Sequence, residues 1–296
     1  MKKKTLYGQT PTRVVTQSSG VRIGGRIVTK EQAEVIAKIK AMDQEDGLKE
    51  IEHLLNYHWV FKDDKSWKVR LAVAHASTKY HGILKDDADW RVRLAVTEAS
   101  TKYHKQLVTD EAWQVRLVAA RASTTYHDIL VSDVNWAVRE AVAKASMTYH
   151  EQLEDDEDEA VRLVVAKTST KYHEQLMCDL SWRVRAAVAK ASTTYHDILK
   201  DDMDWEVRLV VAEASTKYHE QFATDEAWQV RLVVAKETTK YHEQLVDDVE
   251  YIVRAAVSYV SLKHQPLTED PHEVPQIPNT DTNWWLKDIV KNYKEA

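Results

Sequence analysis

Apolar residues recur along most of this chain at a fixed spacing of 23 residues. Each unit begins with Asp, places Trp three residues later, and continues with the run Val-Arg-Leu-x-Val-Ala. A Ser-Thr pair follows, and a Tyr-His pair and a Leu complete the unit. Repetition at a period of about 20 to 50 residues is typical of solenoids, in which each unit covers its neighbour. The pattern predicts nine stacked units between Asp63 and Glu269.

The first half of each unit predicts an α-helix with apolar residues on more than one face. In the first unit these residues include Trp67, Val69 and Val73, and a helix of this kind has neighbours on two sides. We expect Asp64 to be the N-cap, because a carboxylate there accepts amide hydrogens from two and three residues further on. Its charge also suits the positive end of the helix dipole.

The second half of the unit predicts a shorter helical segment. Ser77 or Thr78 is expected to end the first helix and to cap this segment. Tyr80 and Leu84 lie four residues apart, so they share a face and point into the same core as Val73. One unit cannot bury this surface alone, but stacked units form a continuous core. The repeats are therefore expected to form an all-α solenoid with one long and one short helix in each unit.

The stretch from Asp86 to Val96 reads Asp-Asp-Ala-Asp-Trp-Arg-Val-Arg-Leu-Ala-Val. It resembles the leucine-rich repeat variant unit, Asp-Pro-x-Trp-x-Val-Arg-x-x-Val-Ala, and nine such units of 23 residues cover 207 of 296 residues. The resemblance implies alternating α and 3₁₀-like helices in a right-handed superhelix related to HEAT repeats. It implies a scaffold but no particular ligand. The proline after Asp is absent here, and the cysteine-rich iron–sulfur module of some members has no counterpart.

Residues 1–62 are predicted to form a basic arm followed by a cap on the solenoid. Residues 21–28 read as a small β-hairpin on a Gly-Gly turn. Thr29 and Gln32 have the spacing of a capping box, which opens a helix that continues to about Asp46. A second helix is expected before the first repeat.

The two ends of the chain are further candidate contact segments. The basic arm from Lys2 to Arg26 either belongs to the cap or contacts nucleic acid or a partner. Residues 270–296 are predicted to be a linker followed by a short amphipathic helix. Trp284 and Trp285 lie in that helix, and two adjacent tryptophans favour docking on the last repeat or on another chain.

The composition argues against several classes of protein. The chain carries 41 Lys and Arg against 47 Asp and Glu, which argues against a dedicated nucleic-acid-binding protein. The one cysteine, Cys178, cannot form an intramolecular disulfide or a cysteine-based metal centre, so no cofactor is expected. The sequence has no segment of signal-peptide or membrane-spanning type, and we expect a cytoplasmic protein.

An Asp and an Arg recur in every repeat and allow two interpretations. In the first, the arginines form a stripe that binds phosphates or the carboxylates of a partner. In the second, each Arg bonds the capping Asp or the backbone carbonyls of an adjacent repeat. We favour this structural ladder, because each Arg lies beside core valines. In the first three repeats the ladder residues are Asp64, Arg70, Asp87, Arg93, Asp110 and Arg116.

A histidine follows Tyr in eight successive repeats, from His81 to His242. A shared metal ion is not expected, because stacked helices lie about 8 to 10 Å apart and a zinc–nitrogen bond is only about 2.1 Å long. We predict that these histidines are helix-capping or surface groups. No nucleophile accompanies them, so no catalytic site is predicted.

The fifth repeat departs from the pattern, because Glu159 replaces Trp within the acidic run 155–159. This run is a candidate site for Ca²⁺ or a basic partner, although it lacks the glycine turn of an EF-hand. A solvated helix start is the simpler interpretation. Loss of a buried Trp is expected to soften the stack here, which makes this repeat a candidate for a bend or a partner contact.

Recognition is expected in the columns of the repeat that vary. The sequence predicts a non-enzymatic scaffold that binds a protein partner along its concave surface or at an end. The alternative is a nucleic-acid-binding helical-repeat protein that uses the Arg column and the basic arm. The candidate partner-binding residues are Lys68, Arg91, Arg121, Lys144, Arg183, Lys190, Glu159, Trp284 and Trp285.

Overall fold

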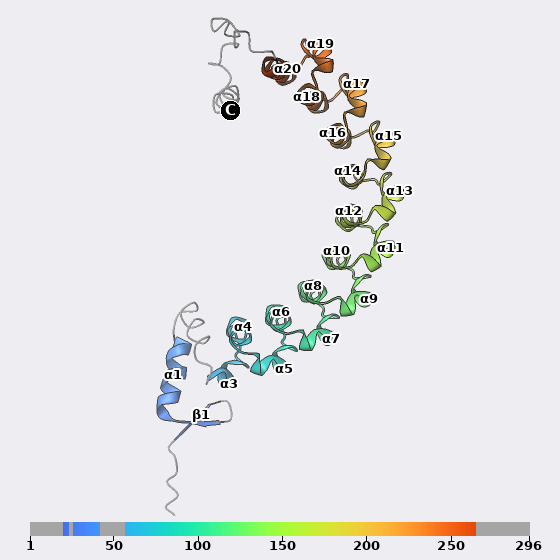
Figure 1. Cartoon of the computed structure of the whole chain (residues 1–296). Helices are drawn as coiled ribbons and strands as arrows, with labels where there is room; N and C mark the ends of the chain where they lie inside the picture. Colours follow the sequence, from blue (N-terminus) through green and yellow to red (C-terminus); the bar gives the residue numbers. More distant parts are fainter. Residues whose placement is uncertain (1–19, 24–25, 42–56, 265–296) are drawn as a thin grey trace, which may run out of the picture. The chain divides into compact units, whose positions relative to one another are not determined.

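The computed structural model of the chain describes residues 20–23, 26–41 and 57–264. The chain divides into two compact units, Met1–Val161 and Arg162–Ala296. In each unit, long helices lie side by side in one layer, and short helical segments form a second layer beside them (Figure 1). The expected all-α solenoid of repeats of about 23 residues is confirmed.

The long helices begin at the Trp position of each repeat, or at the residue that replaces Trp. In the first unit they are α4 (Trp67–Ala76), α6 (Trp90–Ala99), α8 (Trp113–Ala122) and α10 (Trp136–Ala145). The division between the units falls within α12 (Glu159–Thr168). In the second unit they are α14 (Trp182–Ala191), α16 (Trp205–Ala214), α18 (Trp228–Glu237) and α20 (Tyr251–His264).

A 3₁₀ turn and a four-residue α-helix follow each long helix before α20. The 3₁₀ turns are η2 (Thr78–Tyr80), η3 (Thr101–Tyr103), η4 (Thr124–Tyr126), η5 (Met147–Tyr149), η6 (Thr170–Tyr172), η7 (Thr193–Tyr195), η8 (Thr216–Tyr218) and η9 (Thr239–Tyr241). The short helices are α3 (His58–Phe61), which precedes the first full repeat, α5 (His81–Leu84), α7 (His104–Leu107), α9 (His127–Leu130), α11 (His150–Leu153), α13 (His173–Leu176), α15 (His196–Leu199), α17 (His219–Phe222) and α19 (His242–Leu245).

Ser77 makes the junction between the two layers in the first repeat. Its extended backbone, with φ of -159° and ψ of 127°, ends α4, because no helix continues through that conformation. Its hydroxyl oxygen accepts a hydrogen bond from the amide of Lys79 in η2. The predicted double role, as helix end and as cap of the next segment, is confirmed, and Ser77 takes it instead of Thr78.

The loop before each long helix corrects the expected N-cap. Ser66, and not Asp64, occupies the N-cap position of α4. The Asp64 carboxylate accepts the amide hydrogen of Ser66 at 2.9 Å, so it orders the loop just before the helix starts. In the next repeat Asp87 holds the amide of Asp89 in the same way, and Asp89 caps α6 by accepting from the amide of Arg91.

The apolar core lies between the two layers. Val73 of α4 and Leu84 of α5 are 0% and 1% exposed, as predicted. Val69 is half-buried, whereas its counterpart in the next repeat, Val92, is completely buried. Each repeat therefore receives part of its cover from its neighbour, which is the property that the 23-residue pattern predicted.

A hairpin and a helix precede the repeats in the first unit. The strands β1 (Val21–Ile23) and β2 (Arg26–Val28) pair in antiparallel register, as predicted. Helix α1 (Lys30–Ala41) opens with the predicted capping box, in which Thr29 and Gln32 exchange hydrogen bonds of 3.0 and 3.2 Å.

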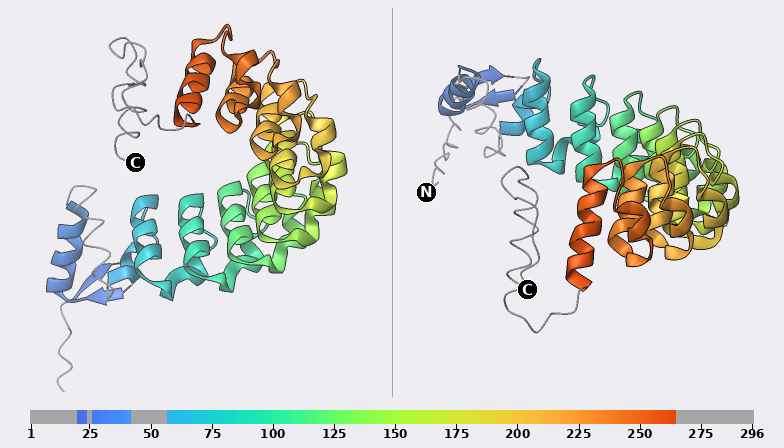
Figure 2. Two further views of the ribbon diagram at one scale, coloured as in Figure 1. Left: turned by 45° about the horizontal axis from the view of Figure 1, so that its top comes forward. Right: turned by 90° about the horizontal axis from the view of Figure 1, so that it is seen from above.

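Ile36 of α1 is 2% exposed and belongs to the same apolar cluster as Phe61 and Val73. The helix and the hairpin therefore cover the first end of the core, beside α3 and α4 (Figure 2). The predictions for residues 42–56 and 265–296, including Trp284 and Trp285, fall outside the described residues. Within the described ranges, no helix combines the length and apolar character that a bilayer span requires.

Candidate functional site

Arg93 shows how one repeat is joined to the next. Its Nε and Nη2 donate to the two carboxylate oxygens of Asp110, in the following repeat, at 2.6 and 2.8 Å. Its Nη1 donates to the backbone carbonyl of Asp87, in the loop before its own helix, at 2.7 Å. Such two-pronged charged hydrogen bonds fix direction as well as distance. The guanidinium therefore holds the loops of two successive repeats together.

The same pairing recurs through both units, with Nε–Oδ2 distances of 2.6 to 2.7 Å. The arginine side chains are 8% to 15% exposed and the aspartates 5% to 7%. We call these pairs the Arg–Asp ladder. They are Arg70–Asp87, Arg93–Asp110, Arg116–Asp133 and Arg139–Asp156 in the first unit, and Arg162–Asp179, Arg185–Asp202, Arg208–Asp225 and Arg231–Asp248 in the second.

The ladder changes the titration of its members. The hydrogen bond to Asp110 raises the pKa of the Arg93 guanidinium above its ordinary value, although burial opposes this shift. Burial alone would raise the pKa of Asp248, but hydrogen bonds from Arg231 and from the amide of Glu250 outweigh it and lower that pKa. Each charged partner thus favours the charged form of the other.

The histidine column is buried, which corrects the expectation of surface groups. His127 is 0% exposed, and its Nε2 lies 2.8 Å from the carbonyl oxygen of Ala120. Since a carbonyl oxygen only accepts, Nε2 must carry the hydrogen. Ala120 lies in the last turn of α8, where carbonyls have no partner within the helix. The expected capping role therefore holds, and it acts on the C-terminal end of the long helix.

Seven other histidines make the same hydrogen bond, at 2.8 to 3.0 Å: His81 to Ala74, His104 to Thr97, His150 to Ala143, His173 to Ala166, His196 to Ala189, His219 to Ala212 and His242 to Ala235. The His127 ring also meets the edge of Tyr149 in the next repeat, with ring centroids 6.1 Å apart. Among the described residues, no three or more His, Cys, Asp or Glu side chains form a group that could hold a metal ion.

The tryptophans that start the long helices form a partly exposed row along one edge of each unit. We call Trp67, Trp90, Trp113 and Trp136 the aromatic edge of the first unit. Trp113 and Trp136 are 38% and 45% exposed. The expectation that Glu159 removes a buried Trp from the core is therefore wrong. Glu159 is itself exposed, and α12 starts there at the usual position of the repeat.

Cationic side chains cover part of the aromatic edge. The guanidinium carbon of Arg91 lies 4.5 Å from the ring centre of Trp67 and 4.9 Å from that of Trp90. Lys68 also lies over Trp67, at 5.9 Å. In the second unit, the guanidinium carbon of Arg183 lies 4.9 Å from the ring centre of Trp182. The predicted contact residues of this column are therefore engaged with aromatic rings of their own chain.

The other predicted contact residues lie further along the long helices. Arg121, Lys144 and Lys190 are exposed near the C-terminal ends of α8, α10 and α14. Lys144 pairs with Glu140 of the same helix at 2.6 Å. In each unit, the predicted residues that the structure describes lie on the layer of long helices, and their binding of a partner remains a prediction.

This repeat geometry has a counterpart among solved structures. A structure described as a leucine-rich repeat variant with a novel repetitive protein structural motif matches with a TM-score of 0.60 and 23% sequence identity. The match covers 66% of this chain and 87% of that one. The chain has the leucine-rich repeat variant fold. The resemblance seen in the sequence is confirmed for the fold, and the relation to HEAT repeats stays a prediction. No family model and no curated protein matches the chain.

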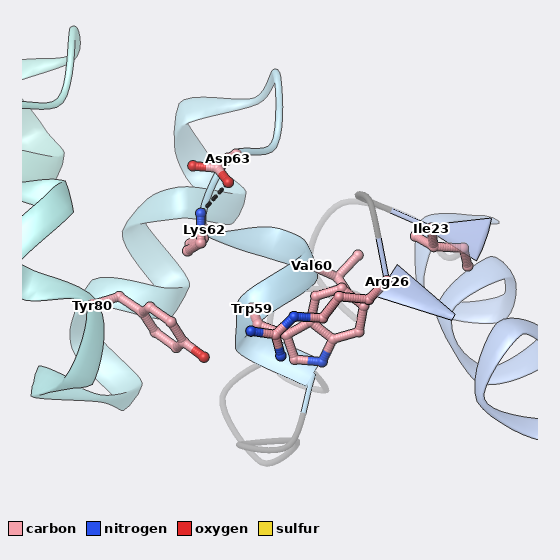
Figure 3. A pocket seen from close by; sticks show the side chains of 7 residues that line it. All are labelled: Ile23, Arg26, Trp59, Val60, Lys62, Asp63 and Tyr80. Carbon is pink, nitrogen blue, oxygen red and sulfur yellow. Dashed lines mark hydrogen bonds and ion pairs between the residues drawn. The ribbon is translucent and has the colours of Figure 1, made fainter. Parts of the chain in front are cut away.

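At the N-terminal end of this leucine-rich repeat variant fold, the hairpin, α3 and the first repeat line a pocket of about 440 Å³ (Figure 3). Its lining consists of Ile23, Arg26, Trp59, Val60, Lys62, Asp63 and Tyr80. The Arg26 guanidinium lies 4.8 Å from the ring centre of Trp59, and Lys62 pairs with Asp63. Arg26, the last residue of the basic arm, therefore stacks on the helix before the first repeat.

Proposed function

We propose that this chain is a non-enzymatic scaffold that binds another protein through the exposed face of its long helices, at the concave surface or the end of the stack. The repeat itself supports this proposal. The ladder residues recur in every repeat and bond within the stack, whereas the varying column that contains Arg121 faces solvent. In α8, Arg116 belongs to the ladder, and Arg121, five residues later, is exposed. Repeat proteins of this kind present extended surfaces for partners.

The nucleic-acid alternative depends on the Arg column and the basic arm, and the geometry of the Arg column favours a protein partner instead. The ladder arginines are 8% to 15% exposed and donate to carboxylates and carbonyls of their own chain. A phosphate would have to displace an aspartate to reach them. A nucleic-acid-binding protein of this kind would also bind more weakly as salt rises from about 50 to 200 mM. We expect no such salt-dependent binding of DNA or RNA by the full chain.

The proposal includes a reducing compartment such as the cytoplasm. The only cysteine, Cys178, is exposed and free in the structure. An exposed free thiol is more common in reducing compartments than in secreted proteins.

Site-specific photo-crosslinking tests the proposal. A photoreactive phenylalanine analogue replaces Arg121, exposed on α8, in one variant and Asp128, exposed on α9 in the other layer, in a matched control. Both proteins are irradiated in extract from the native cell, with and without nuclease. The adducts are then identified by mass spectrometry.

We expect a discrete protein adduct from position 121 that survives nuclease and is absent from position 128. Adducts that disappear with nuclease would support the nucleic-acid alternative instead. No adduct from position 121, or equal adducts from both positions, would contradict the proposed use of the long-helix layer.

A further inference from the structure

The first two repeats show what fills the space between neighbouring indoles of the aromatic edge. Arg91 belongs to the second repeat, and its guanidinium carbon lies within 5 Å of the ring centres of both Trp67 and Trp90. Its Nη1 also lies 3.3 Å from a carboxylate oxygen of Asp89. A guanidinium is attracted to the negative face of an indole, and its planar shape allows stacking. The chain itself thus demonstrates that this space accepts an arginine side chain.

The equivalent space two repeats later lacks this arginine. Ala137 occupies the position of Arg91, and its side chain is too short to reach either indole. Trp113 and Trp136 are correspondingly exposed, whereas Trp67 and Trp90 are half-buried. Within the described part of the chain, no cation lies over the ring of Trp113 or Trp136.

The same ladder contact joins the repeats at both places. The pair that joins the first repeat to the second, Arg70–Asp87, and the pair that joins the third to the fourth, Arg116–Asp133, both have Nε–Oδ2 distances of 2.6 Å. The long helices at each place also pack directly on one another. A guanidinium between Trp113 and Trp136 would therefore meet two indoles in the arrangement that Arg91 meets.

Charge around this second space favours a cationic occupant. Residues 109–159 contain 12 Asp and Glu against 4 Lys and Arg, so the net charge of this stretch is -8, more negative than the -6 of the whole chain. Three of the four cations, Arg116, Arg139 and Lys144, already form ion pairs. Glu111, two residues before Trp113, has a side chain that is 84% exposed, and one of its oxygens lies 3.2 Å from Arg93 Nη2. By contrast, residues 63–85 carry 5 Lys and Arg against 2 Asp and Glu.

We infer that the space between Trp113 and Trp136, above Ala137, binds an arginine side chain from an extended, basic segment of the protein partner. This inference rests on the proposed function and names the chemistry of the partner. The arginine stacks on the two indoles as Arg91 does on its own pair, and the surrounding carboxylates attract the remaining cations of the segment.

Fluorescence anisotropy with the full chain tests this inference. The probe is a fluorescein-labelled Gly-Ser peptide that carries several arginines, and its control has citrulline, the neutral isostere, at the same places. The first variant, Ala137→Arg, fills the space from within and copies the natural residue Arg91. The matched variant, Thr148→Arg, adds the same charge to the same repeat, at an exposed position in the other layer where five repeats carry Lys.

We expect the arginine peptide to bind, the citrulline peptide not to bind, and Ala137→Arg to weaken the dissociation constant by about tenfold, the scale of one cation–π contact. Thr148→Arg should change it by less than about half of that factor, because its effect is only one of net charge. A thermal unfolding curve for each variant verifies that both are folded.

Equal binding of the two peptides, no binding of either, or an equal effect of the two variants would overturn the inference. The proposed function has a separate readout. If the crosslinked partner from position 121 is still captured by Ala137→Arg, the scaffold function stands and only the arginine site is wrong. If position 121 captures no protein while the peptide binds as expected, the scaffold function fails and the arginine site stands.

Discussion

Arg116 in α8 and Asp133 in the following repeat share two hydrogen bonds of 2.6 and 2.7 Å, and both side chains are nearly buried. The Asp133 carboxylate also accepts the amide hydrogen of Asn135 at 2.9 Å, in the loop that leads into α10. One arginine therefore neutralises a carboxylate and fixes the start of the next helix. Removal of one partner leaves the other as an uncompensated charge with little access to water, and this strongly destabilises the fold.

Arg116→Ala is expected to lower the free energy of unfolding by about 3 to 5 kcal/mol, because it leaves the Asp133 carboxylate buried and unpaired. Arg116→Lys keeps the charge but loses the planar fork, so it should cost about 1 to 3 kcal/mol. Urea unfolding followed by circular dichroism measures both changes. Arg121→Ala removes an exposed arginine from the same helix and should stay within about 0.5 kcal/mol.

The destabilisation by Arg116→Ala should also be local, since each repeat contacts only its neighbours. Hydrogen exchange in Arg116→Ala is expected to show reduced protection in α8 and α10 and unchanged protection in α4. A uniform loss of protection across the first unit would show that the ladder is not a contact between adjacent repeats.

The buried hydrogen bond from His127 to the carbonyl of Ala120 gives a second prediction. His127→Leu introduces an apolar side chain of similar size and leaves that carbonyl unpaired in the core, so it should cost about 1 to 3 kcal/mol. Urea unfolding measures the change, and His75→Leu at an exposed position is the control. If His127→Leu and His75→Leu have the same stability, the hydrogen bond has no net stabilising effect.

The repeat and its two layers could be predicted from the sequence because each follows from local chemistry. Ser77 ends one helix and caps the next segment through a hydrogen bond to an amide only two residues away. Val73 and Leu84 are apolar, so a neighbouring repeat has to cover them. The hairpin and the capping box at Thr29 likewise depend on residues only a few positions apart. Such signals need no knowledge of which repeat packs on which.

The errors arose where a residue's role depends on another repeat or on the second layer. The sequence predicted that an Arg of one repeat bonds the Asp of the next, as Arg70 does with Asp87, but it could not show that Asp89, and not Asp87, caps α6. His81 is polar, and its burial depends on the packing of α5 against α4, which brings its ring to the carbonyl of Ala74. For the candidate arginine site, the sequence does contain a signal. One column of the repeat changes from Arg91 to Ala137, but only the structure shows that this change leaves the space between two indoles unfilled.

Two adjacent residues of α9 provide a test of the layer assignment. Leu130 is 1% exposed and Ile129 is 50% exposed, although they are similar in size and hydrophobicity. Leu130→Ala should lower the free energy of unfolding by about 2 to 5 kcal/mol, because it leaves a cavity in the core. Ile129→Ala should change it by about 0.5 kcal/mol or less. Equal losses in urea unfolding, or the reverse order, would show that α9 is turned the other way.

The last pair of the ladder predicts how stability depends on pH. The pKa of Asp248 is lowered in the folded chain, mainly because the hydrogen bonds from Arg231 and from the Glu250 amide outweigh burial. A carboxyl with a lowered folded-state pKa stabilises the fold above its unfolded-state pKa, about 3.9 for Asp, and this stabilisation is lost as the pH falls through the folded-state value. Asp248→Asn should therefore be less stable than the natural chain at pH 7, and the gap should close as the pH falls below about 4. Urea unfolding at several pH values measures the gap, with Asp247→Asn as a control that removes the same charge at an exposed neighbouring position. A gap that stays constant down to the lowest pH would mean that the charge of Asp248 does not stabilise the fold.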